Sequence, residues 1–458
     1  MAAGHPATVE AGLEALEAGG SAADAAVAAG LASCVAETVM TGLLGGGHAI
    51  YYDAITGEAR NLDCFVAAPG LEAPAGRRAE LVELEVPFGT ELVRYAIGVA
   101  SFGVPGLPAG FGALHAAHGR LPWERLVEPA LRLARDGVDF PAAHAACLQM
   151  LEPVMTLNDG APIYTPGGEL LAAGGRLRQP GLVRALELVA EEGPDSAYDG
   201  SIGNALLRLM DERSGLVTRA DLEAYEAEWS PPAVVPYAGT KLLTRTGLAP
   251  LDEPLEVLPT LAGLDAAERA LALVHALDLP DAGGNTTNLV VVDAEGSACV
   301  LTSSLGLGAG EWLPRLDLHL NSMLGESDLI RGELAPGERM GSMMLPSLAL
   351  DADGLAFAGG AAGGTRLRSA LVQVLAGTLD EGLDPGAAVE RPRLHPADGV
   401  VHLEPGFDDD VVAALEQAGY AVRAWPDRHH YFGGVSVVTR AGAAGDPRRS
   451  GAAASLPE

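Results

Sequence analysis

The segment most informative about the fold is Asn285-Thr-Thr-Asn-Leu-Val-Val-Val-Asp-Ala-Glu-Gly-Ser-Ala-Cys-Val-Leu-Thr-Ser-Ser304. It contains two runs of strand-forming residues, 289–293 and 298–302, which flank Asp293-Ala-Glu-Gly296. Aspartate and glycine at these places are typical of a tight turn. The stretch therefore predicts a β-hairpin with a two-residue turn.

In the register that this turn would set, Thr286 lies opposite Ser303, with Thr302 and Ser304 as neighbours. A threonine hydroxyl becomes a useful nucleophile when a base lies beside it. A free α-amino group, whose pKa is about 8, can be that base on the same residue, but only if the chain is cut between Asn285 and Thr286. Threonine and serine are also ordinary strand formers on a half-exposed hairpin, so the pattern by itself leaves both interpretations open.

Outward from the hairpin, the pattern alternates between strands and helices. Helical spacing predicts helices over 6–17, 22–37 (capped by Ser21), 366–379 and 409–418, a mainly helical region over 120–230, and a capping box at Thr218. Strand patterns cover 48–53, 59–63, 434–439 and a second hairpin within 348–357. Residues 281–285, rich in glycine, are a candidate place for a break in the chain. Strands with helices on their outer faces indicate an α/β class.

The composition is that of a large globular protein. Of its 458 residues, 48% are hydrophobic and 20% are charged, which is enough to bury a core. The sequence has no uninterrupted apolar run long enough to cross a membrane, so we expect no membrane partner. The first residues lack the pattern of a secretory signal, and we expect a cytoplasmic protein.

Charge and cysteine content narrow the possible partners. A formal net charge of −32 repels phosphate backbones, so we do not expect nucleic acid as a partner. The four cysteines are widely scattered, without the spacing of a zinc site. His429 and His430, if they lie on a strand, face opposite sides of it and cannot readily bind one ion. We therefore expect no metal and no cofactor.

A second motif is Gly363-Gly364-Thr365, at the start of the helix predicted over 366–379. The first backbone N–H groups of a helix have no partner within it, which makes this place a natural site for an anion or an oxyanion. Its glycine spacing does not fit the G-x-G-x-x-G pattern of dinucleotide-binding folds. A simple strand-to-helix turn explains the same residues. The run Gly45-Gly46-Gly47 is interpreted as structural.

Taken in order, the segments resemble one known family across nearly the whole chain. The matching segments are His5-Pro6, Gly19-Gly-Ser-Ala-Ala-Asp-Ala25, Gly103-Val-Pro-Gly106, Gly119-Arg-Leu-Pro-Trp123, Asn285-Thr-Thr287, Arg339-Met-Gly-Ser-Met-Met-Leu-Pro-Ser347, Gly363-Gly-Thr-Arg366 and Asp446-Pro-Arg448. The sequences of these segments and their order along the chain are similar to those of gamma-glutamyltranspeptidases. The resemblance is weak over 140–210 and 240–284.

This resemblance implies a four-layer αββα sandwich of the N-terminal-nucleophile hydrolase type, formed as a single domain over 1–458. The precursor would cut itself after Asn285 into segments 1–285 and 286–458, which stay associated. Thr286 would be the nucleophile and, through its new α-amine, the general base. Ser304 would hydrogen-bond it, and the N–H groups of Gly363 and Gly364 would stabilise the oxyanion.

The substrate-binding residues implied by the resemblance depart from the family pattern. Phe65 stands where an arginine grips the α-carboxylate of a glutamyl group, and Gly325 stands where a carboxylate holds its α-amino group. Ser322 belongs to that second segment. Ser342 matches the first of the family's paired serines, but Met343 replaces the second.

Three hypotheses follow for a small-molecule amide substrate. The chain could be a gamma-glutamyltransferase or glutathione hydrolase, forming an acyl-enzyme on Thr286. It could be an acylase or amidase that acts on a different acyl group, because Phe65 offers no cation to a carboxylate. It could also be a catalytically silent relative that is used for binding.

Overall fold

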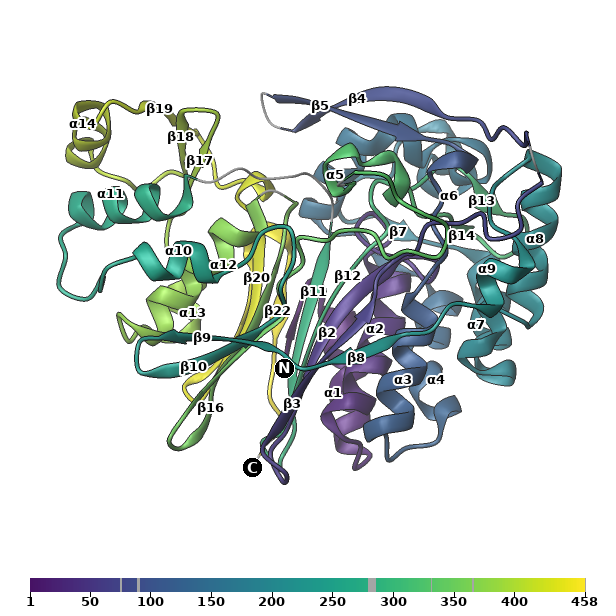
Figure 1. Cartoon of the computed structure of the whole chain (residues 1–458), viewed down its shortest axis with the longest axis horizontal. Coiled ribbons are helices and arrows are strands. Elements are labelled where there is room, and N and C mark those ends of the chain that lie inside the picture. The colour runs from purple at the N-terminus through teal and green to yellow at the C-terminus, as the bar shows by residue number, and fades with distance from the viewer. Residues whose placement is uncertain (75, 89–90, 279–285, 331, 365, 458) are drawn as a thin grey trace.

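The computed structural model describes residues 1–74, 76–88, 91–278, 286–330, 332–364 and 366–457. Its centre is a pair of antiparallel sheets that pack face to face (Figure 1). In spatial order, the first sheet consists of β22 (Ala452–Ala453), β1 (Ala2–Ala3), β11 (Thr287–Val292), β12 (Ala298–Ser304), β2 (Gly46–Asp53), β3 (Glu58–Cys64) and β8 (Glu228–Ser230). The second consists of β21 (Gly442–Gly445), β20 (Gly434–Thr439), β16 (Gly354–Ala362), β15 (Ser347–Asp351), β10 (Thr240–Thr244) and β9 (Ala233–Tyr237).

Helices cover the outer face of each sheet (Figure 1). On the side of the first sheet lie α1 (Pro6–Glu17), α2 (Ala22–Ala36), α3 (Leu107–His118), α4 (Trp123–Asp136), α5 (Ala142–Met155), α6 (Ala161–Tyr164), α7 (Pro180–Glu192), α8 (Ser201–Arg213) and α9 (Arg219–Glu223). On the side of the second lie α10 (Asp252–Val257), α11 (Ala266–Leu277), α12 (Arg366–Leu379), α13 (Pro385–Glu390) and α14 (Asp409–Gln417). The layers thus run helix, sheet, sheet, helix, and the predicted mixed α/β class is confirmed.

Small β-structures lie at the edges of these layers. They are the hairpin of β4 (Val82–Phe88) and β5 (Glu91–Ile97), the pairs β6 (Val138–Asp139) with β7 (Arg176–Leu177) and β13 (Trp312–Leu313) with β14 (Leu318–His319), and the three strands β17 (Leu394–Ala397), β18 (Val400–Leu403) and β19 (Ala421–Ala424). None of the helices within the described ranges is both long and apolar enough to cross a membrane.

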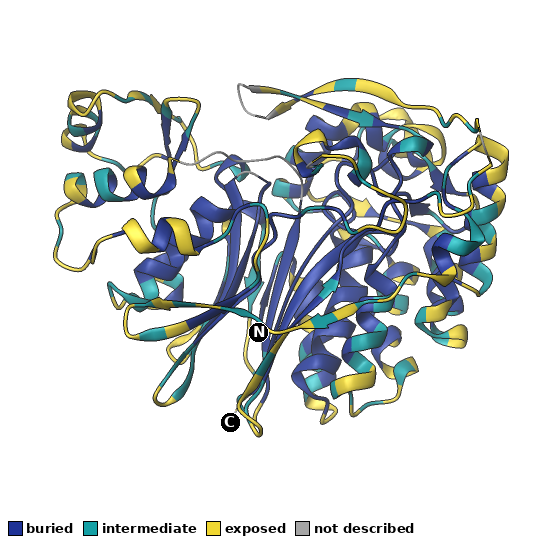
Figure 2. Ribbon diagram, in the orientation of Figure 1, coloured by how far each residue is buried: buried dark blue, intermediate teal, exposed yellow. Residues whose placement is uncertain are grey.

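The strands bury both of their faces, so three hydrophobic layers hold the fold together. Ile50, Val290 and Val300 of the first sheet meet residues of the second sheet between the two layers. Leu289 and Val291 point the other way, into the core beneath α1–α4. Figure 2 shows the sheets and the inward helix faces as buried, and the outer helix faces and loops as exposed. The burial of β11 on both sides fixes which of its residues faces which layer.

Most of the predicted elements are confirmed. The helix predicted over 22–37 is α2, whose N-cap Ser21 forms a capping box with Asp24, and the capping box predicted at Thr218 is formed with Asp221. The helices predicted over 366–379 and 409–418 correspond to α12 and α14. The second hairpin is β15 and β16.

The predicted turn of the β11–β12 hairpin was wrong by one residue. Val292 pairs with Ala298, and the N–H of Asp293 donates to the carbonyl oxygen of Ser297 at 2.9 Å, so the loop has three residues and not two. Gly296 takes up the left-handed conformation that such a loop requires, with φ of 86°. The Asp293 carboxylate stabilises the wider loop, because its Oδ1 accepts from the N–H of Ser297 at 2.9 Å.

The corrected register changes the predicted neighbour of Thr286. Thr287, and not Thr286, pairs with Ser303. Continuing the same register by one residue brings Thr286 level with Ser304, which is the pair that the family resemblance implies.

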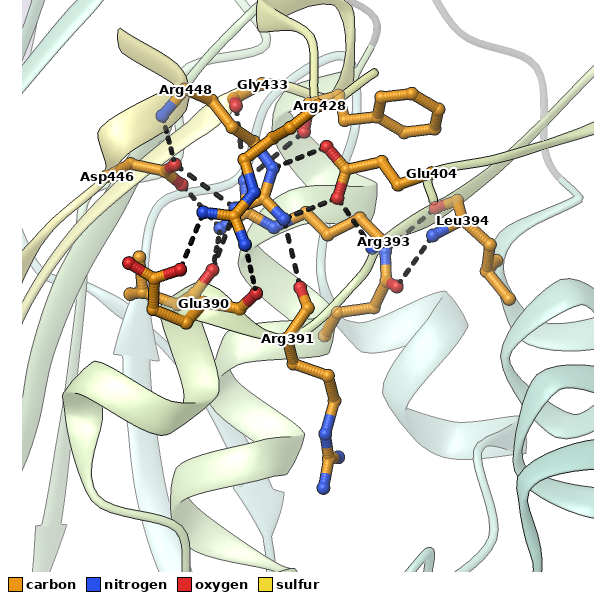
Figure 3. A network of polar contacts seen from close by, with 12 residues as sticks. Glu390, Arg391, Arg393, Leu394, Glu404, Arg428, Gly433, Asp446 and Arg448 are labelled. Carbon is orange, nitrogen blue, oxygen red and sulfur yellow. Dashed lines mark hydrogen bonds and ion pairs between the residues drawn. The ribbon is translucent and has the colours of Figure 1, made fainter. Parts of the chain in front are cut away.

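A buried network of ion pairs joins the C-terminal segment to the second sheet (Figure 3). Arg393 donates to Asp446 Oδ2 at 2.5 Å, and Arg448 donates to Asp446 Oδ1 at 3.2 Å and to the carboxylate of Glu404. Burial alone would raise the pKa of Asp446, but the charges of Arg393 and Arg448 outweigh it and hold that pKa below its usual value. Arg393 also donates to the carbonyl oxygen of Gly433, whose Cα lies behind the glycine turn at 363.

We predict that Asp446→Asn lowers the free energy of unfolding by about 3 kcal/mol, because it leaves two buried guanidinium groups without their shared carboxylate. Chemical denaturation measures this difference. The control is Asp351→Asn, which removes a surface pair with Arg440 and should cost far less because solvent screens that pair. Equal effects of the two substitutions would contradict the structural role of the network.

Candidate functional site

Thr286 lies at the end of β11, where the alternation of the strand decides its orientation. Thr287 points to the helix side, and its Oγ1 donates to the Glu37 carboxylate at the end of α2. Asn288 points to the second sheet, because an added Cβ on Gly360 of β16 would lie 2.2 Å from its Oδ1. Alternation along the strand gives Thr286 the same direction as Asn288. Thr286 is buried, with 4% of its surface exposed, and it borders a cavity on each side.

The front cavity lies beside the end of β11, and its largely apolar wall also contains Glu326 and three hydroxyl side chains. It is lined by Phe65, Thr286, Ser304, Met323, Glu326, Leu329, Ser342, Met343, Met344, Gly364 and Leu367. Methionine side chains are flexible and adapt to irregular apolar groups. A lining of this kind suits an apolar acyl group beside the threonine.

This cavity brings together most of the residues that the sequence analysis singled out. Thr286, Ser304 and Gly364 come from the predicted catalytic set, and Phe65, Ser342 and Met343 come from the predicted substrate-binding set. They lie on separate segments of the chain, which strand pairing and the packing of the connecting segments bring together.

Two predicted residues lie just outside the cavity wall. Gly363 precedes Gly364 in the turn between β16 and α12. Ser322 is buried beneath the end of β12, where its Oγ accepts from the N–H of Leu307 at 3.0 Å, so it supports the turn after the strand. Asn285, the predicted cleavage residue, and Thr365 lie outside the described residues.

The glycine turn has the geometry that its sequence predicts. Gly363 and Gly364 have φ values of 137° and 59°, which are conformations that residues with side chains rarely adopt. The N–H of Leu367 donates to the carbonyl oxygen of Gly364 at 3.1 Å, so the turn runs directly into the first turn of α12. A Cβ on Gly363 would lie 2.8 Å from the Cα of Gly433, so the residue just before β20 leaves no room for one.

Phe65, which stands where the family resemblance implies an arginine, lines the front cavity. It is 1% exposed, and its ring stacks on His48 with centroids 5.3 Å apart. Burial, with Arg245 and Arg339, lowers the pKa of His48 to about 3, so this imidazole is neutral at ordinary pH. Gly46 allows the close approach of this segment, because a Cβ there would lie 2.7 Å from the N of Val66.

Two arginines, Arg245 and Arg366, make contacts outside the front cavity. Arg245 donates to the carbonyl oxygens of Ser342 and Met344 at 3.1 and 3.2 Å, and so holds the loop that carries Met343. Arg366, a possible substitute cation, lies over the ring of Tyr431 at 4.1 Å. Within the described part of the chain, no arginine or lysine lines the front cavity.

Sequence reasoning missed two buried glutamates beside Thr286. Glu37 lines the second cavity that borders Thr286, which we call the back cavity. Its carboxylate accepts hydrogen bonds from Thr8 Oγ1 at 2.6 Å and from Thr287 Oγ1. Burial raises its pKa, while the hydrogen bonds from Thr287 and Thr8 and the charges of His5 and Arg449 oppose that rise. Glu326 lines the front cavity, and burial raises its pKa to about 8, with Asp328 adding to the rise. Glutamates are common on surfaces, and nothing in their local sequence marks these two as buried.

The histidine pair lies differently from the strand arrangement considered in the sequence analysis. His430 begins a 3-10 helix, His430–Phe432, with His429 as its N-cap, and the ring centroids lie only 4.1 Å apart. The argument that strand alternation separates them is therefore wrong. Among the described residues, no group of three or more potential metal ligands comes together.

Comparison with known proteins identifies the family. The sequence matches the Gamma-glutamyltranspeptidase family over residues 8–250 and 266–456. The chain belongs to this family, and this membership places it among the family's hydrolases and acylases.

The relatives include both acylases and glutathione hydrolases. The chain is 27% identical to "Acylase ACY 1 proenzyme" from Pseudomonas sp. strain V22, over 95% of this chain and 88% of the relative. It is 25% identical to the "Glutathione hydrolase proenzyme" of Escherichia coli K12, over 90% of this chain and 83% of the relative. The crystal structure of cephalosporin acylase from Bacillus halodurans superposes with a TM-score of 0.84 at 23% identity, over 100% of this chain and 95% of that one, and so shares its fold.

The raised pKa of Glu326 gives a prediction about pH. Because the folded protein holds this proton more tightly than the unfolded chain, Glu326 contributes stability that is complete below about pH 4.5 and is lost as the pH rises through about 8. The free energy of unfolding of the wild type, relative to Glu326→Gln, should therefore fall across this range. Denaturation at a series of pH values measures it. Glu333→Gln, at an exposed position, is the control, and a pH-independent difference for Glu326→Gln would contradict the prediction.

Proposed function

We propose that this chain is a self-processing N-terminal-threonine hydrolase that acts on an amide whose acyl group is not gamma-glutamyl. The observation that carries the proposal is that Thr286 opens onto an apolar cavity walled by Phe65 and methionines, with no arginine or lysine among its described lining residues. In this proposal the helix–sheet–sheet–helix layering is the αββα sandwich of the N-terminal-nucleophile hydrolases.

The first step is cleavage of the precursor between Asn285 and Thr286. The products would be the segments 1–285 and 286–458, and each of the two main sheets contains strands from both. In the first sheet, β11 and β12 follow Thr286 and lie between β1 and β2, which precede it. Such interleaving supports the continued association of the two segments as one domain after the cut.

In the proposed reaction, the Thr286 Oγ attacks the carbonyl carbon of the substrate, and the α-amine takes the hydroxyl proton. The N–H groups of Gly363 and Gly364 receive the developing oxyanion, and Ser304 holds the threonine from the neighbouring strand. The protonated amine then gives its proton to the leaving nitrogen, and the C–N bond breaks. Water, or an amine in the transfer reaction, attacks the resulting ester on Thr286 and regenerates the enzyme.

The acyl group would lie along Phe65, Met343 and the neighbouring apolar side chains. A gamma-glutamyl group would place its α-carboxylate near Phe65. An unpaired charge in an apolar site costs several kcal/mol. An apolar acyl chain carries no charge that needs a partner, and its burial is favourable through the hydrophobic effect. Acylase ACY 1 proenzyme, one of the relatives of this chain, is an acylase by name, which agrees with a non-glutamyl acyl group.

We predict that purified wild-type protein consists of two chains that begin at residues 1 and 286. Thr286→Ala should remain one intact chain, because the hydroxyl that attacks the preceding peptide bond is missing. Thr286→Ser keeps a hydroxyl and should still be cut. Mass spectrometry of the denatured protein measures the fragments, and an active wild type that stays intact would refute the assignment of Thr286.

We also predict that a neutral N-acyl amide is a better substrate than glutathione at similar length, as measured by kcat/KM. Loss of matched polar partners reduces the preference for an old substrate by up to about 10⁴-fold. A hundredfold preference for glutathione would show that a cation reaches the pocket after all, and the chain would then be a glutathione hydrolase in the ordinary sense of its family.

A further inference from the structure

One oxygen of a buried carboxyl group on the wall of the front cavity has no hydrogen-bond partner within the described part of the chain. Glu326 is 3% exposed and borders the same cavity as Thr286. Its Oε1 has no hydrogen-bond partner among the described residues. Buried polar atoms are nearly always hydrogen-bonded, so an unpartnered carboxylate oxygen at a cavity wall indicates a place for a ligand donor.

The protein makes room for this carboxylate. A Cβ on Gly306 would lie 2.5 Å from Glu326 Oε1 and 2.6 Å from Ser322 Oγ, so only glycine fits beneath it. The N–H of Gly306 in turn donates to Ser304 Oγ at 2.9 Å, which links the turn under Glu326 to the residue beside Thr286. The position of Glu326 is thus coupled to the wall that carries the reacting threonine.

The neighbouring position cannot supply a carboxylate. A Cβ on Gly325 would lie 1.7 Å from the carbonyl oxygen of Ala96 in β5, and no side chain is possible there. The next residue, Glu326, is the one that brings a carboxylate to the cavity from this segment. Among the described residues, Asp328 on the same segment and Tyr95 on β5 interact electrostatically with it, and Arg366 acts on Tyr95.

We propose that Glu326 is a specificity-determining residue that binds an ammonium group on the acyl chain of the substrate. This assignment rests on the proposed acylase function and names its substrate class, an amide of an amino-substituted aliphatic acid that lacks a carboxylate. The methylene chain would lie against Met323, Met343 and their neighbours, and the ammonium would donate to Oε1 of Glu326.

Ammonium fits this site better than the other possible acyl ends. A hydrogen bond between charged groups is roughly twice as strong as a neutral one, and an ammonium supplies the countercharge that lets the buried Glu326 side chain give up its proton and ionise. A hydroxyl would satisfy Oε1 but would bring no charge. A terminal carboxylate would meet no arginine or lysine among the described lining residues, and a methyl end would leave Oε1 unpartnered.

The experiment compares amides of one leaving group whose acyl chains have equal length and end in methyl, hydroxyl, ammonium or carboxylate. For the self-processed wild type, we expect kcat/KM for the ammonium member to exceed that for the methyl member by about tenfold or more, mostly through KM. The carboxylate member should be the poorest. A second pair of substrates carries the ammonium either on the α-carbon or at the chain end. Comparison of their kcat/KM values shows which position of the ammonium Glu326 can reach.

The matched variants are Glu326→Gln, which keeps the shape but not the charge, and Glu333→Gln, which makes the same charge change at an exposed position. The first should lose the ammonium preference about tenfold, and the second should keep it, so a general attraction of cations to an acidic protein is controlled for. Self-cleavage into two chains shows that each variant folds. If Glu326→Gln does not cleave itself, the wild-type series decides the question alone.

Two results overturn the proposal, and they are distinct. Equal kcat/KM for the methyl and ammonium members, or a preference that survives in Glu326→Gln, removes the role of Glu326 and leaves the acylase function in place. Failure of the self-processed wild type to cleave any member of the series contradicts the proposed function itself, and the assignment of Glu326 falls with it.

Discussion

The pairing of β11 with β12 is the constraint on which the rest of the site depends. Side chains alternate along a strand, so a shift of one residue would exchange the two faces of β11. In the observed register, Leu289 and Val291 enter the core beneath the helices, Val290 enters the core between the sheets, and Thr287 reaches Glu37. Thr286 is then left at the cavity wall, level with Ser304. Asp293 fixes this register from the far end of the hairpin, because its carboxylate also accepts from the N–H of Ala22 at 3.0 Å and ties the loop to α2.

Much of the fold could be predicted because its signals are local. Ser21 and Thr218 cap their helices with neighbours three residues away, and such short-range geometry is visible in the sequence. The hairpin turn failed because the extra loop residue is stabilised by the side chain of Asp293, which the turn pattern alone does not reveal. A register error of a single residue was enough to give Thr286 the wrong partner.

The residues of the candidate site could be predicted only where they belong to motifs that resemble those of the family. Thr286, Ser304 and Gly364 stand at matched motifs, and the structure places all three on one cavity. Glu326 and Glu37 carry no such motif. Their burial arises from tertiary contacts, with β5 closing over the segment at 325 and α2 ending against β11. The sequence showed the loss of a carboxylate at Gly325, whereas the structure shows why none fits there and which residue lies next to the gap.

The residues around Thr286 and the residues of the pocket wall lie on different kinds of structure. The pocket wall can therefore change while the surroundings of Thr286 stay the same. Thr286 and Ser304 belong to the central strands of a sheet buried on both faces, and the glycine turn is held against β20, so small shifts there would disturb the whole core. Phe65, Glu326 and Met343 lie instead on connecting segments packed at the end of the sheets. Substitutions on such segments change the chemistry of the pocket and leave the strand register intact. The side chains that line the pocket can therefore change without rebuilding the strands that position Thr286.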